Sequence, residues 1–190
     1  MVTIAEPDDR WPQEFRAIAA TLSAVLGGDA RRIDHIGSTS VPGLPAKDVI
    51  DVQVTVADGD ALERVSGALA ERGWRRMVPA SDHHVPGLPG DAAEWHKAFF
   101  DEPEGERPTH VHVRIDGRAN QRYALLFRDY LRAHPDAAAT YAQVKRGLAE
   151  LAPDPGTYAD AKDPACDLIY HAAERWATEG AATSDRSPPG

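Results

Sequence analysis

Hydrophobic and polar residues alternate in two stretches of the chain, and this alternation predicts two half-buried β-strands. Residues 50–56 and 110–115 both place valine or isoleucine at every second position, and successive side chains of a strand point to opposite faces of its sheet. The polar residues between them are Asp51, Gln53, Thr55, His110, His112 and Arg114. If both strands pack their apolar sides on the same helices, the polar side chains line one open face of the sheet.

Helical spacing of apolar residues predicts five helices around these strands. They cover residues 11–26, about 60–72, 120–132, 135–151 and about 163–180. The second helix is expected to begin at Asp58 or Asp60, and the fifth at Asp163-Pro164, as an N-cap and first turn. Short β-prone runs predict three further strands at residues 31–36, 74–78 and 97–100.

Two other segments have no regular pattern. Residues 79–94 are rich in Pro, Gly, Asp and His, and loops of this length are uncommon unless they are functional or mobile. Residues 183–190 are polar and end in Pro-Pro-Gly, which favours a loose tail. Because no linker divides the remainder, we predict one domain over residues 1–178 and a flexible C-terminal tail over residues 179–190.

The net charge and the cysteine content of the chain limit the kinds of binding partner that we expect. The chain has 190 residues and a formal net charge of −9, whereas non-specific nucleic-acid or membrane binding requires a basic face. The single cysteine, Cys166, excludes an internal disulfide framework and fits a reducing cytoplasm. No apolar stretch reaches membrane-spanning length. We therefore expect a cytoplasmic protein with a small-molecule or nucleotide substrate and no membrane partner, and the sequence leaves open whether it forms a homo-oligomer.

The segment between the strands at 31–36 and 50–56 is a loop with tightly prescribed turns, because glycine, proline and hydroxyl residues fill it. Backbone N–H groups and hydroxyls in such a loop are suited to phosphate oxygens. The groups available are the N–H groups of Gly37 and Ser38 and the hydroxyls of Ser38, Thr39 and Ser40. Lys47 adds a compact positive charge at the loop exit.

Two familiar motifs are absent from this loop. It lacks the Gly-x4-Gly-Lys-Ser/Thr order of a Walker A loop, and residues 37–41 lack the second glycine of a nucleophile elbow. A serine hydrolase built on Ser38 and His35 is therefore disfavoured.

Asp51, His110 and His112 are the candidates for metal or anion binding. A lone His-x-His pair is weak evidence, because two exposed histidines on a strand are commonly inert. Convergence with a carboxylate from a neighbouring strand makes a metal or anion site reasonable.

Arg128 and Arg132 lie one helical turn apart on one predicted helix, and Tyr141 and Lys145 have the same spacing on the next. The commoner outcome for such residues is a solvated helix surface with ion pairs. The functional alternative is a basic wall over the sheet face that neutralises a triphosphate.

Several motifs of the chain resemble the GrpB family, small proteins similar to nucleotidyltransferases. The most specific is the string His35-Ile-Gly-Ser-Thr-Ser-Val-Pro-Gly-Leu. The others are Trp11-Pro12, Lys47, Ile50-Asp51, His110-Val-His-Val, Phe127-Arg-Asp-Tyr-Leu-Arg, Tyr141 with Lys145, Lys162 and Trp176. The likeness covers almost all of residues 3–178. The family also occurs fused to dephospho-coenzyme A kinase, whereas this sequence contains no P-loop.

The resemblance implies an α/β (α+β) fold of the nucleotidyltransferase type, with a mixed β-sheet, helices packed mainly on one face and a helical C-terminal third. In the wider superfamily a Gly-Ser turn holds the nucleotide phosphates, a carboxylate-x-carboxylate strand binds Mg²⁺, and a neighbouring strand adds a third carboxylate. Gly37-Ser38 matches the turn and Asp51 the first carboxylate.

This sequence departs from the superfamily pattern at the other two carboxylates. The second position is Gln53, which brings no negative charge, and the third is His112, a softer ligand. Asp48 does not replace them, because its strand parity differs from that of Asp51. The implied metal ligands are Asp51, Gln53, His110 and His112, a set that would hold two Mg²⁺ ions poorly.

Three hypotheses follow, and the sequence leaves open whether the chain is an enzyme. The leading one is a metal-dependent nucleotidyl or phosphoryl transferase acting on a small molecule, with Mg²⁺ or Mn²⁺ as cofactor, a nucleoside triphosphate as substrate or ligand, and Asp51 and His112 as catalytic candidates. Its phosphate-binding residues would be Gly37, Ser38, Thr39, Ser40, Lys47, Arg128 and Lys145. The second hypothesis, motivated by Gln53, is a non-catalytic nucleotide- or coenzyme-binding module. The third is a different metalloenzyme with a two-histidine, one-carboxylate site.

Overall fold

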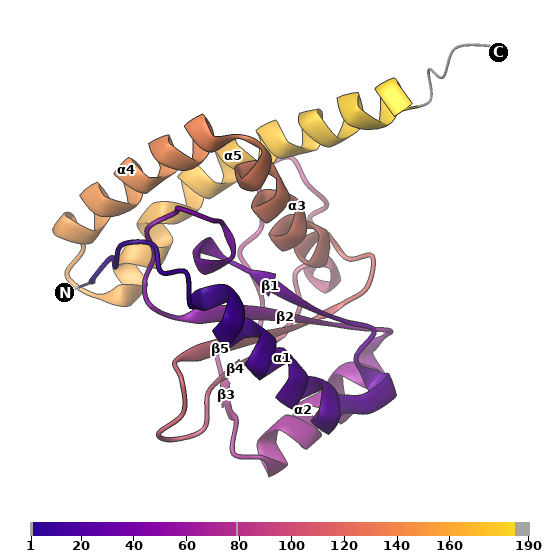
Figure 1. The fold of residues 1–190 in the computed structure, drawn as a ribbon. Helices are drawn as coiled ribbons and strands as arrows, with labels where there is room; N and C mark the ends of the chain where they lie inside the picture. The colour runs from indigo at the N-terminus through magenta and orange to yellow at the C-terminus, as the bar shows by residue number, and fades with distance from the viewer. Residues whose placement is uncertain (1, 79, 185–190) are drawn as a thin grey trace.

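A mixed five-stranded sheet organises the protein (Figure 1). The computed structural model describes residues 2–78 and 80–184. The strands are β1 (Arg32–Ile36), β2 (Ile50–Val56), β3 (Arg75–Met77), β4 (Ala98–Asp101) and β5 (Thr109–Ile115), in the spatial order β1-β2-β5-β4-β3. The central strands β2 and β5 are parallel and the other neighbours are antiparallel. The predicted fold class is confirmed, and the two alternating stretches are indeed neighbours.

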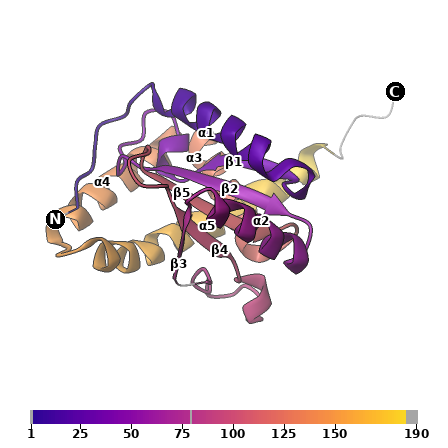
Figure 2. The ribbon, with the colours of Figure 1, turned by 90° about the horizontal axis from the view of Figure 1, so that it is seen from below.

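Five α-helices flank the sheet. They are α1 (Trp11–Leu26), α2 (Gly59–Glu71), α3 (Ala119–Ala133), α4 (Pro135–Leu151) and α5 (Pro155–Ser184). α1 and α2 lie side by side on one face, and α3, α4 and α5 gather on the other side (Figures 1 and 2). Asp58, one of the two predicted caps, accepts a hydrogen bond of 2.8 Å from the Ala61 N–H and starts α2.

The apolar face of the sheet makes the main core, as the alternation predicts. Ile50, Val52, Val54, Val111 and Val113 are fully buried beneath α1 and α2. Burial of a valine or isoleucine side chain contributes roughly 1.5–3 kcal/mol. This face therefore fixes the register of β2 and β5 and decides which side chains point to the opposite face.

The polar face is not open along its whole length, which corrects the expectation from the sequence. Gln53 and Thr55 are fully buried, because α3 covers this end of the face. The Gln53 amide donates a hydrogen bond of 3.2 Å to the Gln121 carbonyl of α3. Asp51, His110, His112 and Arg114 of this face line a cavity.

The segment between β3 and β4 folds back onto the C-terminal helices. Val85 and Trp95 are buried against Tyr170 of α5, and a short 3₁₀ helix, η3 (Ala92–Glu94), precedes Trp95. Residue 79, the first of the predicted excursion, lies outside the described residues. The described part of the loop contributes Ser81, Asp82 and His83 to the cavity wall.

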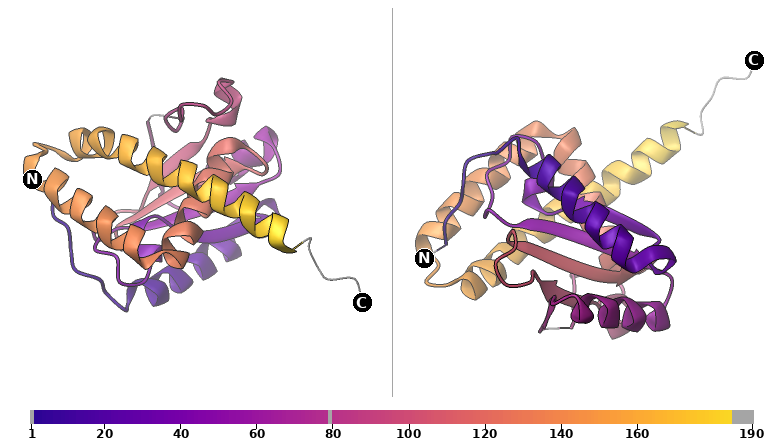
Figure 3. Two further views of the ribbon diagram at one scale, coloured as in Figure 1. Left: turned by 90° about the horizontal axis from the view of Figure 1, so that it is seen from above. Right: turned by 60° about the horizontal axis from the view of Figure 1, so that its bottom comes forward.

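The start of the last helix was predicted wrongly. α5 begins at Pro155, because the Asp154 carboxylate accepts hydrogen bonds from the Gly156 and Thr157 N–H groups. Pro164 lies inside the helix. α5 continues through Ser184, packing against α3 and α4 and extending beyond them (Figure 3). The predicted loose tail is thus helical at residues 179–184, and its residues 185–190 lie outside the described residues.

The N-terminal segment joins the helical side of the molecule. Val2 is buried with Ala149, Ala152 and Tyr158 at the junction of α4 and α5, close to the marked N-terminus (Figure 2). Within residues 2–78 and 80–184, no helix combines the length and the apolar character needed to cross a lipid bilayer.

Candidate functional site

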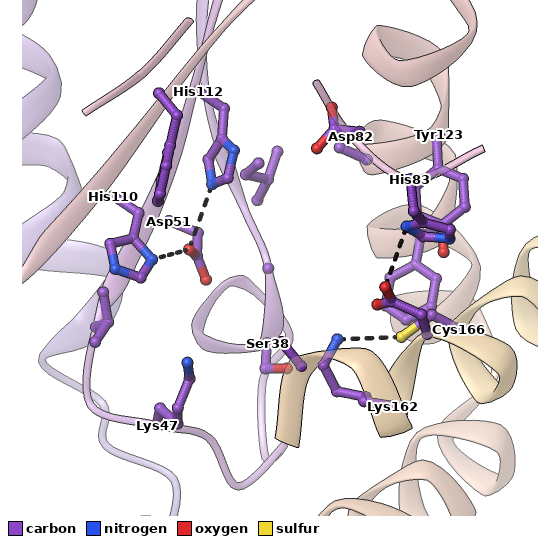
Figure 4. Close-up of a pocket in the computed structure, with 18 of the residues that line it drawn as sticks. Ser38, Lys47, Asp51, Asp82, His83, His110, His112, Tyr123, Lys162 and Cys166 are labelled. Atoms are coloured by element: carbon purple, nitrogen blue, oxygen red, sulfur yellow. Dashed lines mark hydrogen bonds and ion pairs between the residues drawn. The ribbon is translucent and has the colours of Figure 1, made fainter. Parts of the chain in front are cut away.

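Asp51, His110 and His112 converge at the open end of the polar face (Figure 4). β2 and β5 pair with Asp51 beside His110 and Gln53 beside His112. The Asp51 Oδ1 atom lies 3.3 Å from His110 Nδ1 and 3.7 Å from His112 Nε2. One ligand atom from each residue lies within 4.8 Å of the others. Sequence parity therefore identified the residues that meet, although their metal-binding role stays a prediction.

The groups behind the two histidines differ. His110 Nε2 lies 3.6 Å from the Asp101 carboxylate at the end of β4. His112 Nδ1 lies 3.4 Å from both Lys97 Nζ and Arg114 Nη2. The His110 imidazole is thus next to a second carboxylate, and the His112 imidazole is next to two cationic side chains.

These surroundings set the protonation of the site. Burial would raise the pKa of Asp51, but hydrogen bonds to His110 and His112 outweigh it and hold that pKa well below its ordinary value. Burial opposes charge on His110 too, yet its hydrogen bond with Asp51 raises the His110 pKa. Burial, together with the positive charge of Arg114, lowers the pKa of His112 to about 4. At neutral pH the site therefore contains a charged carboxylate and a neutral His112.

The Gly-Ser loop lies directly beside Asp51. Gly37 has a φ of +67°, and a Cβ atom on it would lie 2.2 Å from Asp51 Oδ2. Only glycine fits here without displacing the carboxylate. Ser38 begins a 3₁₀ turn, η2 (Ser38–Ser40), and lines the cavity. The loop thus delivers its backbone next to the candidate metal ligand.

The hydroxyls of this loop do not all face the cavity. The Ser40 hydroxyl donates a hydrogen bond of 2.6 Å to the Gly37 carbonyl. The Thr39 hydroxyl donates to the Val49 carbonyl at 3.3 Å and lies 3.0 Å from His35 Nε2. Thr39 and Ser40 are buried, so their hydroxyls hold the loop in shape. Ser38 is the hydroxyl residue positioned for a ligand in the described loop.

Two arginines of α3 hold the loop by its carbonyl groups. Arg128 donates a hydrogen bond of 3.0 Å to the His35 carbonyl, and Arg132 donates two to the Ser40 carbonyl, at 3.0 and 2.7 Å. Neither arginine lines the cavity. The structure therefore places the predicted phosphate ligand Arg128 behind the loop, where it positions the backbone.

Several lysines line a cavity of about 830 Å³ between the sheet and α5. Lys47 points into it beneath His110, and Lys162 of α5 approaches from the opposite wall near Ser38 (Figure 4). Lys145 is buried and donates a hydrogen bond to the Pro45 carbonyl. Burial, with the nearby charge of Lys162, lowers the Lys145 pKa to about 7. Lys47, Lys145 and Lys162 thus share the cavity lining with Ser38.

Gln53 is occupied by protein contacts. Its Oε1 atom accepts a hydrogen bond of 2.7 Å from Arg114 Nη1, and its amide nitrogen donates to Gln121. A role for Gln53 as a metal ligand stays a prediction, and it would require Arg114 to release the amide oxygen.

Sequence reasoning missed a buried charge cluster that supports this face. Asp82 accepts hydrogen bonds from Lys97 at 2.5 Å and from Arg114 at 2.8 and 3.0 Å. Asn120 of α3 also donates to Asp82, at 3.1 Å. Burial would raise the pKa of Asp82, but the charges of Arg114 and Lys97 outweigh it and lower that pKa. No spacing rule connects a loop aspartate with these residues, so only the fold reveals the cluster.

A second polar group lies on the α5 wall. His83 Nε2 lies 2.8 Å from Asp167, and His83 Nδ1 lies 3.4 Å from Asp163. Tyr123 of α3 donates to Asp167 at 3.4 Å. These contacts join the loop before β4 to α5 across the cavity from Asp51 (Figure 4).

Comparison with known proteins assigns the family. The family model described as GrpB protein matches residues 1–172. The chain belongs to the GrpB family. A protein named dephospho-CoA kinase from Mycolicibacterium paratuberculosis is 38% identical over 195 residues, which cover 93% of this chain and 47% of that protein. The GrpB chain thus spans about half the length of these first relatives. A UPF0157 protein from Streptomyces coelicolor is 36% identical, over 85% of this chain and 78% of its own length.

Solved structures agree with the family and the fold. The crystal structure of GrpB from Enterococcus faecalis matches with a TM-score of 0.73 at 29% identity, covering 92% of this chain and 99% of that one. The RNA terminal uridylyl transferase Cid1 matches with a TM-score of 0.51 at 18% identity, covering 75% of this chain and 40% of that one. At this identity the likeness to Cid1 concerns the fold alone, which is nucleotidyltransferase-like.

Proposed function

We propose that this GrpB protein is a nucleotidyl or phosphoryl transferase that acts on a small molecule and uses Mg²⁺ or Mn²⁺. One observation carries the proposal: the Asp51 carboxylate touches Gly37 at the start of the Gly-Ser turn, inside a cavity that also contains lysines. A carboxylate beside backbone N–H groups and cations is suited to a metal-bound polyphosphate.

Different residues of the site would bind the metal ion and the phosphate groups. Asp51 and His110 would hold the ion, Ser38 and the Gly37 backbone would bind phosphate oxygens, and Lys47 would neutralise their charge. When bound, the ion would withdraw charge from the transferring phosphoryl group. His112, the other catalytic candidate, faces the same Asp51 oxygen.

Lys145 and Lys162 extend the phosphate site towards the helices. Both line the cavity, and Lys162 Nζ lies 3.3 Å from the Cys166 sulfur. The lowered pKa of Lys145, about 7, leaves this side chain only partly charged at neutral pH. We therefore assign the stronger phosphate contacts to Lys47 and Lys162.

The names of the relatives support a nucleotide- or coenzyme-related ligand. Dephospho-CoA kinase is the name of proteins about twice as long as this chain, so that activity is not carried over. A cavity of about 830 Å³ falls within the usual range for small-molecule sites, roughly 300–1,000 Å³. It has room for a nucleotide and part of an acceptor.

A thermal-shift experiment tests the proposal. A ligand that binds the folded state alone stabilises it by RT ln(1 + [L]/Kd), about 2.7 kcal/mol at 100 times Kd. We expect Mg²⁺– or Mn²⁺–nucleoside triphosphates to raise Tm, and Asp51→Asn to abolish the increase. Asp60→Asn, at the exposed start of α2, is the matched control and should retain it. No shift with any of the common triphosphates would remove the proposal.

Gln53 favours a second candidate, a nucleotide- or coenzyme-binding module without turnover. The superfamily pattern has a carboxylate at this position, whereas Gln53 is neutral and bound to Arg114. In this case the same triphosphates raise Tm but are recovered unchanged after long incubation with candidate acceptors. Radiolabelled product on thin-layer chromatography decides between the two functions.

A further inference from the structure

The two histidines of the His-x-His strand have opposite neighbours. His110 has one ring nitrogen facing Asp51, at 3.3 Å, and the other facing Asp101, at 3.6 Å. Histidines that ligate metals commonly donate their second N–H to a carboxylate, which orients the ring and makes the ligating nitrogen more basic. Asp101 is placed to do this for His110, and the Nδ1 lone pair of such a ring could bind a metal shared with Asp51 in place of the present contact between the two side chains.

His112 has the reverse arrangement. Its Nδ1 atom lies 3.4 Å from Lys97 Nζ and from Arg114 Nη2. Lysine and arginine only donate hydrogen bonds, so Nδ1 must accept. A neutral ring then carries its proton on Nε2, the atom that faces Asp51 at 3.7 Å. His112 is therefore a hydrogen-bond donor towards Asp51, and that nitrogen has no lone pair for a metal.

Lys97 and Arg114 are fixed in place. Asp82 binds both of them, Gln53 binds Arg114, and all four side chains are buried or nearly so. Breaking a buried pair of this kind leaves an uncompensated charge and is strongly unfavourable. The cationic side chains of Lys97 and Arg114 thus lie beside His112, on the same face of the sheet as Asp51.

We propose that this face takes one divalent ion, held by Asp51 and His110 with Asp101 behind, and that Lys97 and Arg114 supply the positive charge that a second ion would bring. His112 is a positioning residue that donates to Asp51 and stays off the metal. This inference rests on the proposed function and specifies its metal site. The donor set fits a single ion that completes its shell with water or phosphate oxygens, and it does not fit a pair of Mg²⁺ ions.

Mn²⁺ alone is the probe, because its free form is counted directly by electron paramagnetic resonance. We expect one Mn²⁺ per chain in a titration of the full chain. His110→Gln should weaken binding at least about tenfold, and Asp101→Asn should weaken it by about 10–100-fold. His112→Gln keeps an N–H donor near the Nε2 position and should change the Mn²⁺ affinity less than about threefold, because the hydrogen bond to Asp51 is retained.

Nitrogen-15 NMR of the ring provides a readout independent of the metal. His112 should show a protonated Nε2 and an acceptor Nδ1 in the metal-free protein. Two Mn²⁺ ions per chain, no Mn²⁺ binding, or equal losses in His110→Gln and His112→Gln would each overturn the inference. Because nucleotide is absent from this titration, its result is separate from the thermal-shift test of the proposed function.

Discussion

Gly37 and Asp51 are in such close contact that any side chain at residue 37 must move the carboxylate. Gly43 has a similar φ, +75°, but a Cβ atom there would meet nothing within 4 Å. Gly43→Ala should therefore cost only the left-handed backbone penalty, about 1–2 kcal/mol in the free energy of unfolding. Gly37→Ala should cost about 1 kcal/mol more and abolish Mn²⁺ binding. Urea unfolding and the Mn²⁺ titration measure both effects, and equal behaviour of the two variants would contradict the close contact.

His35 gives the fold a dependence on pH. Its ring is buried against Phe15 and Thr39, and burial lowers its pKa from 6.5 to about 4. The unfolded chain then binds the proton more tightly, so the stabilisation is complete above pH 6.5 and is lost as the pH falls towards 4. The expected loss between pH 7 and pH 4 is about 2–3 kcal/mol.

Urea unfolding at a series of pH values tests this assignment. His35→Gln retains a polar group near Thr39 but does not titrate, so its free energy of unfolding should fall by about 2–3 kcal/mol less than that of the wild type over the same range. Parallel curves for the two proteins would show that His35 is not the group responsible.

At the scale of elements, alternation in β2 and β5 was sufficient to predict both the buried face and the meeting of Asp51 with the two histidines. A period of two and a shared core leave little freedom for such strands. The sequence could not indicate that α3 covers the other half of the polar face, because that depends on long-range packing. For the same reason the sequence predicts that the Gln53 side chain is available as a ligand, whereas the structure buries it.

The last helix shows where local signals are insufficient. Asp154-Pro155 and Asp163-Pro164 are the same start signal repeated nine residues apart. A proline is favourable at the first turn and costly inside a helix, which made the second pair look like the start. Packing of Tyr158 and Cys166 against α4 extends the helix through Pro164.

This reassigned start makes Asp154 the residue on which the beginning of α5 depends. Its side chain accepts three hydrogen bonds, from two backbone N–H groups and the Thr157 hydroxyl. Asp154→Ala should lower the free energy of unfolding by about 1 kcal/mol. Asp160→Ala, at an exposed position of the same helix, should change it by less than about 0.5 kcal/mol. Chemical denaturation compares them, and a larger effect at Asp160 would contradict the start at Pro155.

Asp82 connects three elements, namely the loop before β4, strand β5 and helix α3. Asp82→Asn would remove the charge that balances Lys97 and Arg114, so we expect a loss of about 3 kcal/mol in the free energy of unfolding. Asp91→Asn makes the same change in the same loop at an exposed position where asparagine also serves as a cap. It should be nearly neutral.

Hydrogen exchange adds a local readout for this pair of variants. If Asp82 holds the loop, the backbone amides of residues 81–96 should exchange faster in Asp82→Asn than in the wild type. In Asp91→Asn their exchange rates should equal those of the wild type. Uniform loss of protection over the whole chain would instead mean that Asp82 contributes only to global stability.

At the scale of the molecule, the cavity lies between two differently built halves. The sheet with α1 and α2 presents Asp51, and the helical half presents Lys162 (Figure 4). His83, from the loop before β4, is bound to Asp163 and Asp167 of α5. Each half has its own apolar cluster, one beneath β2 and β5 and one between α3, α4 and α5. A ligand in the cavity would contact both halves, so its binding should be sensitive to changes in either.

The fold is shared with Cid1, an RNA terminal uridylyl transferase, which raises the question of whether this protein binds RNA. Its charge argues against it, with 30 acidic residues against 21 lysines and arginines. Several of the basic residues are already paired, such as Arg118 with Glu94 at 3.0 Å and Arg122 with Glu174 at 2.8 Å. RNA binding without sequence preference depends on a continuous basic groove and on the release of counterions.

We therefore expect a fluorescent single-stranded RNA to bind more weakly than about 10⁻⁵ M at physiological salt, at or below the usual strength of non-specific binding. Any residual anisotropy change should disappear as salt is raised, because exposed charges are then screened.

A second experiment measures the thermal shift with a metal–nucleoside triphosphate in the presence of excess RNA. A small-molecule transferase keeps that shift unchanged, because the RNA does not enter the cavity. Submicromolar RNA binding that competes with the triphosphate would mean that the acceptor is a nucleic acid, in spite of the negative net charge.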